Sequence, residues 1–407
     1  MEQRISRRLV VVLAAACGLA AANLYYAQPL LPTIADSLHV SGAAVGIIVT
    51  LTQVGYVLGL VFLVPLGDLL ERRRLVVATL GITTLALIAA ALAPSLPVLV
   101  AAVAAIGVTS VVAQVLVPLA ASLAGDGERG RVVGTVMSGL LIGVLLARSL
   151  AGAMAQLAGW RSIYWLAAAL MLALAGVLWR ALPATHTRVE LSYPGLLRSV
   201  LELLRTEPVL RRRCLYGGCV FAAFQTLWAT VAFLLAAPPF GYGELVIGLF
   251  GLLGAAGALG ATVAGRVADR GHERLASGLY LALIVVAFAV MIPARHHLWP
   301  LVIGIVLLDL GVQGAQIGNQ SAIYRLRPDA RSRITTAYIG SYFVGGVAGS
   351  ALASYVYHSF GWLGLCCLGC GFGALAVLLW ATDRSTARPA VKSPTDQTSA
   401  ARSAAEA

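Results

Sequence analysis

The sequence predicts an all-α membrane protein with twelve transmembrane helices arranged as two pseudo-symmetric six-helix bundles. Only 11% of the 407 residues are charged and 59% are hydrophobic, whereas soluble proteins carry about 25% charged residues. Apolar runs of roughly 20 residues, the length that crosses a bilayer, recur along the chain. The second half of the chain also repeats polar residues of the first half.

Twelve apolar runs are long enough to be membrane spans, and we number them one to twelve in chain order. They are Leu9–Ile34, Ala43–Leu66, Leu75–Leu92, Leu96–Leu123, Val132–Leu157, Ser162–Leu182, Cys214–Ala236, Leu245–Val267, Leu275–Pro293, Trp299–Ile323, Ile334–Tyr357 and Leu363–Ala381. We expect residues 1–182 to form one bundle and residues 214–382 the other. The linker 183–213 should contain an amphipathic surface helix, because its apolar residues recur at helical spacing. Residues 383–407 should be a disordered tail.

The basic residues predict the orientation. All 29 Lys and Arg residues except Arg148, Arg161 and Arg295 fall on the side that carries both termini. Loops rich in Lys and Arg face the cytoplasm, so both termini are expected there. The net charge of +12 then reflects anchors that face anionic lipid, the run Arg211–Arg213 among them. No nucleic-acid partner is expected.

An internal repeat relates the two halves of the chain. Tyr26 corresponds to Trp228, Gln114 to Gln316, and Gly143 to Gly345. Two halves in the same orientation imply a pseudo-two-fold axis along the membrane normal, with the substrate site at their interface. Small residues in spans five and eleven should allow close helix packing. They are Gly139, Gly143, Gly345, Gly346 and Gly349.

Asp309 points most directly to function. It is the only Asp or Glu deep inside an expected span, where an ionisable side chain is costly unless it faces a cavity or a partner. Gln313, Gln316 and Gln320 follow it on one helical face. We interpret this stripe as the lining of an aqueous pathway and Asp309 as a group that takes up and releases a proton. The alternative is an interhelical hydrogen bond that only fixes packing.

Arg148 is the only basic residue inside an expected span. Counting inward at 1.5 Å per residue, Arg148 and Asp309 lie at similar depth, roughly 13–15 Å from the outer ends of spans five and ten. We therefore expect a pair between them that bridges the halves when the outer side is closed. The alternative is that Arg148 binds substrate or backbone carbonyls and never meets Asp309.

Further polar and aromatic residues are expected to line a central cavity. Polar amides in membrane helices also join helices to one another, and aromatic rings also fill bundle cores, so each residue has a packing alternative. Tyr26 and Trp228 could stack on a flat or apolar substrate. The expected lining residues are Asn23, Tyr26, Gln28, Gln53, Tyr56, Gln114, Gln225, Trp228, Gln313, Gln316 and Gln320.

Twelve spans, a two-fold repeat and a long central loop resemble the major facilitator superfamily. The family's pattern between spans two and three is Gly-x-x-x-Asp-Arg-x-Gly-Arg-Arg. Residues 64–73 match its Asp with Asp68 and its basic pair with Arg72 and Arg73, but lack both glycines and the first Arg. The second copy, residues 265–271, keeps more of the pattern. The resemblance implies a cytoplasmic latch formed by Asp68, Arg72, Arg73, Asp269 and Arg270; the alternative is interfacial carboxylates that balance nearby arginines.

Within that family the chain resembles the bacterial drug:proton antiporter branch. The run from Asn23 to Pro32 is similar to a first-span signature of that branch. The branch's fifth span ends Gly-Pro-x-x-Gly-Gly. Here Gly143 is kept, but Val144 replaces the Pro and Ala147-Arg148 replaces the last pair. The pattern leaves antiport, symport and uniport open.

The most consistent function is a secondary transporter that exports a small organic molecule in exchange for protons, by rocking two halves around a central site. Proton-coupled uptake, uniport of a metabolite, and a transporter-like sensor or binding scaffold remain alternatives. No phosphate-loop motif, hydrolase motif or metal-ligand cluster occurs, so we expect no enzyme, cofactor or metal. The expected partners are substrate, protons and the bilayer, with the chain as a monomer.

Overall fold

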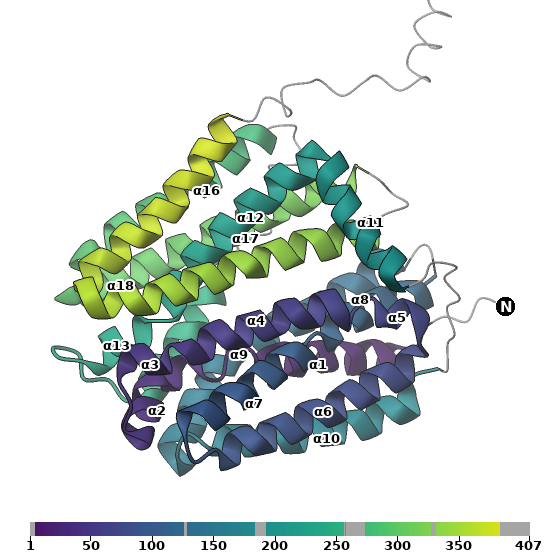
Figure 1. Ribbon diagram of the computed structural model, residues 1–407, viewed down its shortest axis with the longest axis horizontal. Coiled ribbons are helices and arrows are strands. Elements are labelled where there is room, and N and C mark those ends of the chain that lie inside the picture. Colours follow the sequence, from purple (N-terminus) through teal and green to yellow (C-terminus); the bar gives the residue numbers. More distant parts are fainter. Residues whose placement is uncertain are drawn as a thin grey trace, which may run out of the picture.

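The structure, a computed structural model, describes residues 5–125, 128–183, 193–255, 257, 273–326 and 331–382. Within these residues the regular elements are all helices (Figure 1). Nine of the described helices are long and apolar enough to cross a membrane. One of them, α18 (Arg331–Ala381), contains expected spans eleven and twelve, separated by a kink at Gly361, where φ is 66°. Span eight is described only in its first half, and the expected tail lies outside the described residues.

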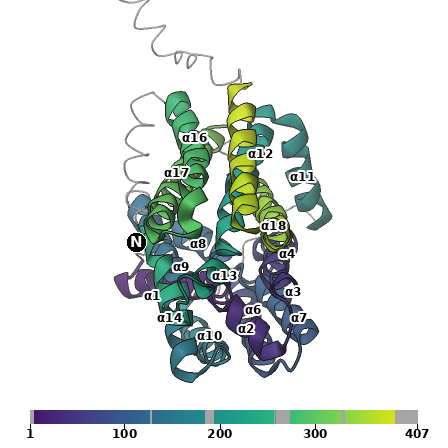
Figure 2. The same ribbon diagram turned by 90° about the vertical axis from the view of Figure 1, so that its left-hand side faces the viewer.

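The first bundle holds the helices of spans one to six. They are α1 (Arg7–Ala22), η1 (Gln28–Leu30), α2 (Leu31–Leu38), α3 (Gly42–Val45), α4 (Ile47–Phe62), α5 (Leu66–Leu69), α6 (Arg72–Leu92), α7 (Leu96–Thr109), α8 (Val112–Leu123), α9 (Arg129–Ala158) and α10 (Ser162–Ala181). In Figures 1 and 2 this bundle is coloured purple to blue.

The second bundle, coloured teal to yellow, holds the later spans (Figure 2). Its helices are α12 (Pro208–Trp228), α13 (Val231–Ala236), α14 (Glu244–Leu249), η2 (Phe250–Leu253), α16 (Glu273–Met291), η3 (Ile292–Arg295), α17 (Leu298–Tyr324) and α18. The linker contains helix α11 (Tyr193–Thr206), whose Tyr193 hydroxyl donates to the carbonyl of Phe62 in the first bundle at 3.0 Å.

Close glycine contacts repeat from one bundle to the other. A Cβ on Gly143 of α9 would overlap the backbone of Gly18 in α1, and a Cβ on Gly345 of α18 would overlap the backbone of Gly218 in α12. Gly143 and Gly345 are equivalent in the internal repeat. The same helix pair is therefore packed backbone to backbone in each half, as the small residues of spans five and eleven predicted.

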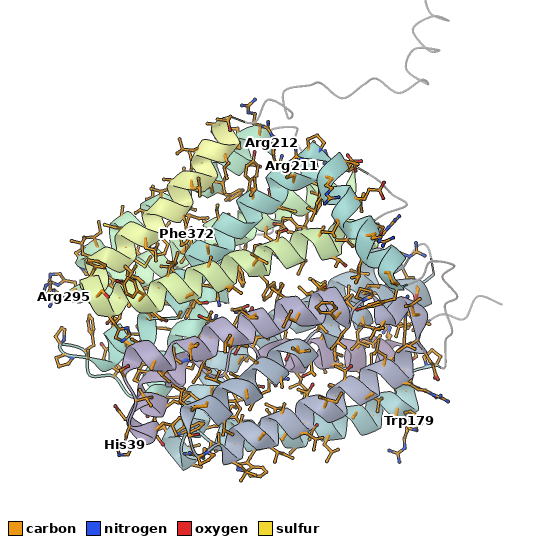
Figure 3. All side chains as sticks on the ribbon, in the orientation of Figure 1. His39, Trp179, Arg211, Arg212, Arg295 and Phe372 are labelled. Carbon is orange, nitrogen blue, oxygen red and sulfur yellow. The ribbon has the colours of Figure 1, made fainter. Side chains whose placement is uncertain are left out.

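The two bundles are joined at the end of the molecule that lies away from the N-terminus, which we call the distal end (left in Figure 1). Figure 3 labels His39 and Arg295 at this end. Three hydrogen bonds cross between the bundles there. Thr33 donates to Glu244 at 2.7 Å, Ser149 donates to the carbonyl of Gly248 at 3.1 Å, and the Thr50 and Ser350 hydroxyls lie 3.1 Å apart.

Arg213 corrects one expectation. We assigned it with Arg211 and Arg212 to the anchors that face lipid, but α12 begins at Pro208, so Arg213 lies inside the helix and is 1% exposed. Figure 3 shows Arg211 and Arg212 at the surface of the bundle. Arg213 Nη1 donates to the Asn319 side-chain oxygen at 3.2 Å, and Asn319 Nδ2 donates to the Tyr338 hydroxyl at 3.3 Å. This guanidinium therefore joins spans seven, ten and eleven.

Replacement of Gly143 by Ala tests the tight packing of α1 on α9. We expect a loss of about 1–3 kcal/mol in unfolding free energy, because the added methyl overfills the contact. The matched control is Gly134→Ala on the same helix, where nothing lies within 4 Å of the added Cβ. The control should gain about 0.5–1 kcal/mol, because Ala is a better helix former. Thermal unfolding of both purified variants measures this, and shifts of the same sign and size would contradict the contact.

Candidate functional site

The polar stripe of span ten faces away from span nine. A Cβ on Gly314 of α17 would overlap the Tyr280 ring of α16, and Gly311 faces the Tyr280 carbonyl. Asp309, Gln313, Gln316 and Gln320 lie on the opposite face of α17, because a helix turns 100° per residue. Asp309 is 5% exposed, whereas the three glutamines are half-buried. Exposure along the stripe therefore rises toward the end of the molecule that carries the N-terminus.

Four glycines at the start of span eight form a single face, which we call the glycine row: Gly248, Gly251, Gly254 and Gly257. Part of this segment, η2, is a 3₁₀ helix, in which residues three apart lie above one another. A Cβ on Gly251 would meet Arg148 Cβ and Cδ at 2.9 and 3.1 Å. A Cβ on Gly257 would meet Asp309 Cβ at 2.8 Å. The glycine row therefore brings Arg148 and Asp309 onto one face of span eight.

Arg148 is held by neutral side chains from both bundles. Its Nε donates to Gln28 Oε1 at 2.8 Å. Its guanidinium carbon lies 4.0 Å from the ring centre of Trp228, 4.9 Å from that of Tyr25 and 5.9 Å from that of Phe224. A cation over an aromatic face is attracted to the electrons of the ring. Trp228 and Phe224 belong to the second bundle, so this contact crosses the interface.

The expected direct pair between Arg148 and Asp309 is not formed among the residues that the structure describes. Arg148 Nη2 and Asp309 Oδ2 are both buried without a hydrogen-bond partner. Gln28 and the aromatic rings instead fix the orientation of the guanidinium. Both side chains lie against the glycine row, Arg148 at Gly251 and Asp309 at Gly257. Similar depth in the membrane does not by itself determine direct contact.

Breaks in two helices position the partners of Arg148. The first span leaves α-helical geometry after Ala22, continues from Gln28 as the 3₁₀ helix η1, which contains Pro29, and becomes α-helical again in α2 at Leu31. Proline has no backbone N–H to donate, which favours a break there. The seventh span breaks after Trp228, the last residue of α12. Interrupted helices near the middle of the membrane are typical of substrate sites in transporters.

Aromatic rings extend from Arg148 across both bundles in what we call the aromatic band. The ring centres of Tyr56 and Phe343 lie 4.2 Å apart, those of Phe343 and Phe221 4.9 Å, and those of Phe224 and Trp228 6.1 Å. Tyr342 stacks on Phe221 at 4.2 Å. The band is defined by Tyr56, Phe221, Phe224, Trp228, Tyr342 and Phe343.

The remaining predicted lining residues divide into three groups. Gln114 Nε2 donates to the Tyr56 hydroxyl at 3.2 Å, which places it beside the aromatic band. Gln53 and Gln225 are fully buried, and both amide atoms of each lack a hydrogen-bond partner. Asn23 instead faces Met171 of α10, with 3.5 Å between Nδ2 and Sδ. Because of this contact, Asn23 lies away from Arg148 and the aromatic band. Tyr26 is 1% exposed in the core of the first bundle.

The expected latch is only partly described. The side chain of Asp68, together with Asp269 and Arg270, lies outside the described residues. Arg72 Nε donates to the carbonyl of Gly67 at 3.1 Å. Arg73 lies 3.3 Å from Glu71 and 4.8 Å from the Trp179 ring centre. Both described contacts of Arg73 lie within the first bundle, and sequence reasoning had overlooked Glu71.

The sequence analysis also missed Tyr25, Phe221, Phe224, Tyr342 and Phe343. A signal was available for two of them, because Phe221 and Phe224 lie four residues before Gln225 and Trp228, on the same helical faces. The three-residue spacing of the glycine row was also visible. Nothing in the local sequence marks Tyr342 or Phe343, which are two of many aromatic residues in apolar runs.

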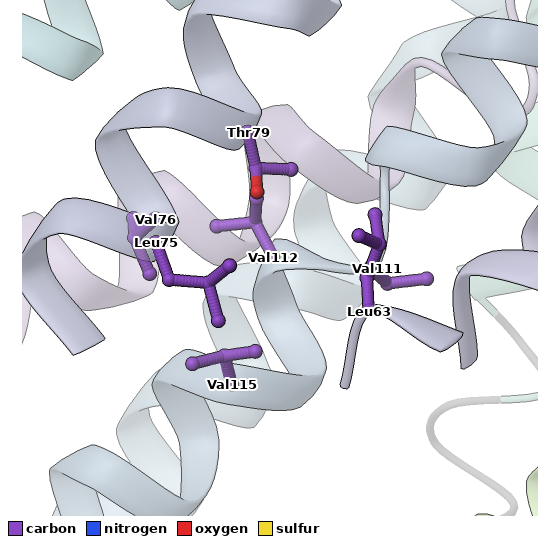
Figure 4. Close-up of a pocket in the computed structure, with 7 residues that line it drawn as sticks. All are labelled: Leu63, Leu75, Val76, Thr79, Val111, Val112 and Val115. Atoms are coloured by element: carbon purple, nitrogen blue, oxygen red, sulfur yellow. The ribbon is translucent and has the colours of Figure 1, made fainter. Parts of the chain in front are cut away.

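A small pocket elsewhere does not compete with this site. It lies between spans two, three and four, is lined by apolar side chains and Thr79 (Figure 4), and has a volume of about 10 Å³. That volume is near the minimum for a single water molecule. It is too small for an organic substrate.

Comparison with known proteins agrees with this architecture. The family described as Major Facilitator Superfamily matches residues 13–295. The chain is 48% identical over 379 residues to "Uncharacterized transporter YgaY" of Escherichia coli O157:H7, covering 93% of this chain and 96% of that protein. It is 34% identical to "Probable transporter SCO4007" of Streptomyces coelicolor, covering 94% of this chain and 88% of that protein.

More distant similarities extend over most of the chain. A "Probable sugar efflux transporter" of Helicobacter acinonychis is 26% identical, with 86% of this chain and 87% of that protein covered. The crystal structure of a bacterial homolog to the human lysosomal transporter Spinster, in an inward-facing and occupied conformation, has a TM-score of 0.74 at 12% identity. The match covers 92% of this chain and 95% of that one. The chain thus belongs to the major facilitator superfamily and is a multi-pass membrane transporter.

Proposed function

We propose that the chain exports a small organic molecule in exchange for protons, by alternating access, with Asp309 as the proton-carrying group. In this proposal it works as a monomer in the bacterial inner membrane, with both termini in the cytoplasm. The resemblance to drug:proton antiporters supports the direction, as does the relative named as a sugar efflux transporter.

One observation carries the proposal: among the residues that the structure describes, buried polar atoms without hydrogen-bond partners gather where the bundles meet. They include Gln28 Nε2, Arg148 Nη2, Trp228 Nε1 and Asp309 Oδ2. Each such atom costs about 1–3 kcal/mol if it stays unpaired, so a polar ligand that reaches them gains by pairing with them. A site that only fixed packing would have paired these donors and acceptors with one another.

The contacts between bundles support a site that is closed at the distal end. The three hydrogen bonds described between the bundles lie there. Farther toward the middle of the molecule, the contact between Arg148 and Trp228 also joins the bundles. Toward the opposite end, Gln316 and Gln320 of α17 are half-buried. The charge distribution supports an orientation with the distal end outside the cell. In this proposal the site opens to the cytoplasm.

Asp309 and Arg148 lie where proton binding can affect the separation of the two bundles. Both contact the glycine row, so a shift of span eight would change the distance between them. Arg148 also contacts Trp228 across the interface, so separating the bundles at the distal end breaks that contact. Opposite charges that share one face of span eight attract each other in a medium of low dielectric constant. Protonation of Asp309 therefore changes the free energy of opening, which links proton binding to the transport cycle.

Replacement of Asp309 by Asn tests proton coupling. In proteoliposomes with an imposed pH gradient, a transported compound should collapse the gradient through the native protein. The gradient should persist with the variant, because an amide side chain at this position cannot release a proton. Asp309→Glu should keep part of the activity, because it keeps a carboxylate. The matched control is Asp36→Asn, which removes an exposed carboxylate of α2 and should leave transport unchanged.

The sign of proton movement separates the alternatives. Protons that move against the direction of substrate indicate antiport, and protons that move with it indicate symport. Substrate flux without proton movement in either the native protein or Asp309→Asn would show a uniporter and overturn the proposal. Saturable binding without flux would indicate a sensor or scaffold.

A disulfide across the distal contact tests alternating access. The Thr50 and Ser350 hydroxyl oxygens are 3.1 Å apart. A disulfide needs two cysteines whose Cβ atoms lie close together. We therefore expect the double variant Thr50→Cys/Ser350→Cys to form a disulfide on oxidation. Oxidation should stop substrate flux and reduction should restore it, because the bundles must separate there. Each single variant serves as control for the native cysteines. Unchanged flux in the fully oxidised double variant would contradict movement at this contact.

A further inference from the structure

We propose that the substrate is an organic anion whose carboxylate or similar oxyanion binds Arg148 Nη2, and whose flat apolar body lies against the aromatic band. The inference rests on the proposed function and names the class of molecule that the site takes. It depends on the partners of Arg148, on the charges around it and on the shape of the neighbouring surface.

Among the described residues, the partners of Arg148 leave Nη2, with its two N–H donors, without an acceptor. Arginine has five N–H donors and no acceptor. Gln28 accepts from Nε at 2.8 Å, while Trp228 and Tyr25 face the guanidinium at 4.0 and 4.9 Å. These contacts fix the orientation of the group, yet Nη2 is buried without a partner. A guanidinium held in this way is preorganised for an oxyanion, whose hydrogen bonds to it are charge-assisted.

The charges around the site favour an anion over a neutral ligand. Arg148 is 3% exposed and its hydrogen-bond partner, Gln28, is uncharged. Asp309 is the nearby carboxylate, and it makes no ion pair with Arg148 among the described residues. A buried charge with only neutral partners is unfavourable in a medium of low dielectric constant. A bound anion supplies the missing charge.

The aromatic rings beside Arg148 favour a flat apolar body. Phe224 and Trp228 lie next to the guanidinium, and the aromatic band continues through Phe221 to Phe343 and Tyr56 of the other bundle. Aromatic rings stack on flat apolar groups in offset or edge-to-face geometry. Aromatic or conjugated carboxylates combine both features in one molecule, so this is the class that we expect.

An anionic substrate has a consequence for the charge carried in each cycle. Entry of one proton and exit of one monoanion move charge in the same sense, so each exchange carries two elementary charges. Symport of the same proton and anion carries none, and exchange of a proton for a neutral molecule carries one. The membrane potential therefore distinguishes these cases.

The first experiment compares binding of acids and their amides to the purified native protein. The probes are a panel of aromatic carboxylates, each paired with its primary amide and with the corresponding sulfonate, and the readout is ligand-induced stabilisation against heat. We expect the acids to bind about 10- to 100-fold more tightly than the amides, because a charge-assisted hydrogen bond is lost. The sulfonates show whether any oxyanion suffices. Equal binding of acids and amides throughout the panel would overturn the proposal.

Variants of Arg148 assign the effect to this residue. Arg148→Gln should remove the preference for acids over amides, whereas Arg148→Lys should keep part of it through its charge. The matched control, Arg180→Gln, removes an exposed positive charge in the last turn of α10 and should leave the preference intact. If Arg148→Gln does not fold, the Lys variant and the acid–amide comparison in the native protein still decide the question. An unchanged preference in both Arg148 variants would rule out this binding site.

Flux measurements keep this inference separate from the proposed function. For a transported acid, an inside-negative potential set by valinomycin should accelerate export through the native protein, as two charges per exchange require. Proton-coupled flux of the amides at the rate of the acids would overturn the anion site and leave proton coupling through Asp309 intact. Selective transport of the acids, with proton movement unchanged in Asp309→Asn, would support the anion site and overturn proton coupling through Asp309.

Discussion

A guanidinium inside a membrane bundle needs partners from the protein, and Arg148 is oriented by neutral groups from both halves, while Nη2 has no hydrogen-bond partner among the described residues. Gln28 and Tyr25 come from the first span, and Trp228 comes from the seventh. Several other features follow from this arrangement. The first span must break so that Gln28 can reach inward, and the seventh must end its helix at Trp228. The aromatic band then continues the surface that begins at Arg148.

The glycine row leaves the space that this arrangement needs. Arg148 and Asp309 can approach span eight only because no side chain projects from Gly251 or Gly257. The same close approach recurs inside each bundle, where Gly143 meets Gly18 and Gly345 meets Gly218. Helices that touch through backbone atoms have few interlocking side chains to resist sliding, so these contacts suit a protein whose halves move. Packing and mobility thus depend on the same small residues.

The sequence predicted the fold class and several residues of the centre, but not how they pair. Hydropathy and charge identified the spans, and the cost of burying a carboxylate marked Asp309. Depth along a helix follows from residue number, so Arg148 and Asp309 were placed at similar levels. Their rotation about the helix axes depends on tertiary packing, and so the contact of Arg148 with Trp228 could not be foreseen. For Arg213, the apolar run was taken to begin at Cys214, whereas α12 begins at Pro208, so a buried arginine was placed in a loop.

Opening the distal end changes what Arg148 contacts. Its cation–π contact with Trp228 joins the two bundles, so separation leaves the guanidinium with Gln28 and Tyr25 alone. A charge in that position gains most from a nearby anion, which is either Asp309 or a bound substrate. Arg148 therefore links the distal contact to the occupancy of the central site, because the guanidinium that helps to close the interface is also the group that would bind an anion.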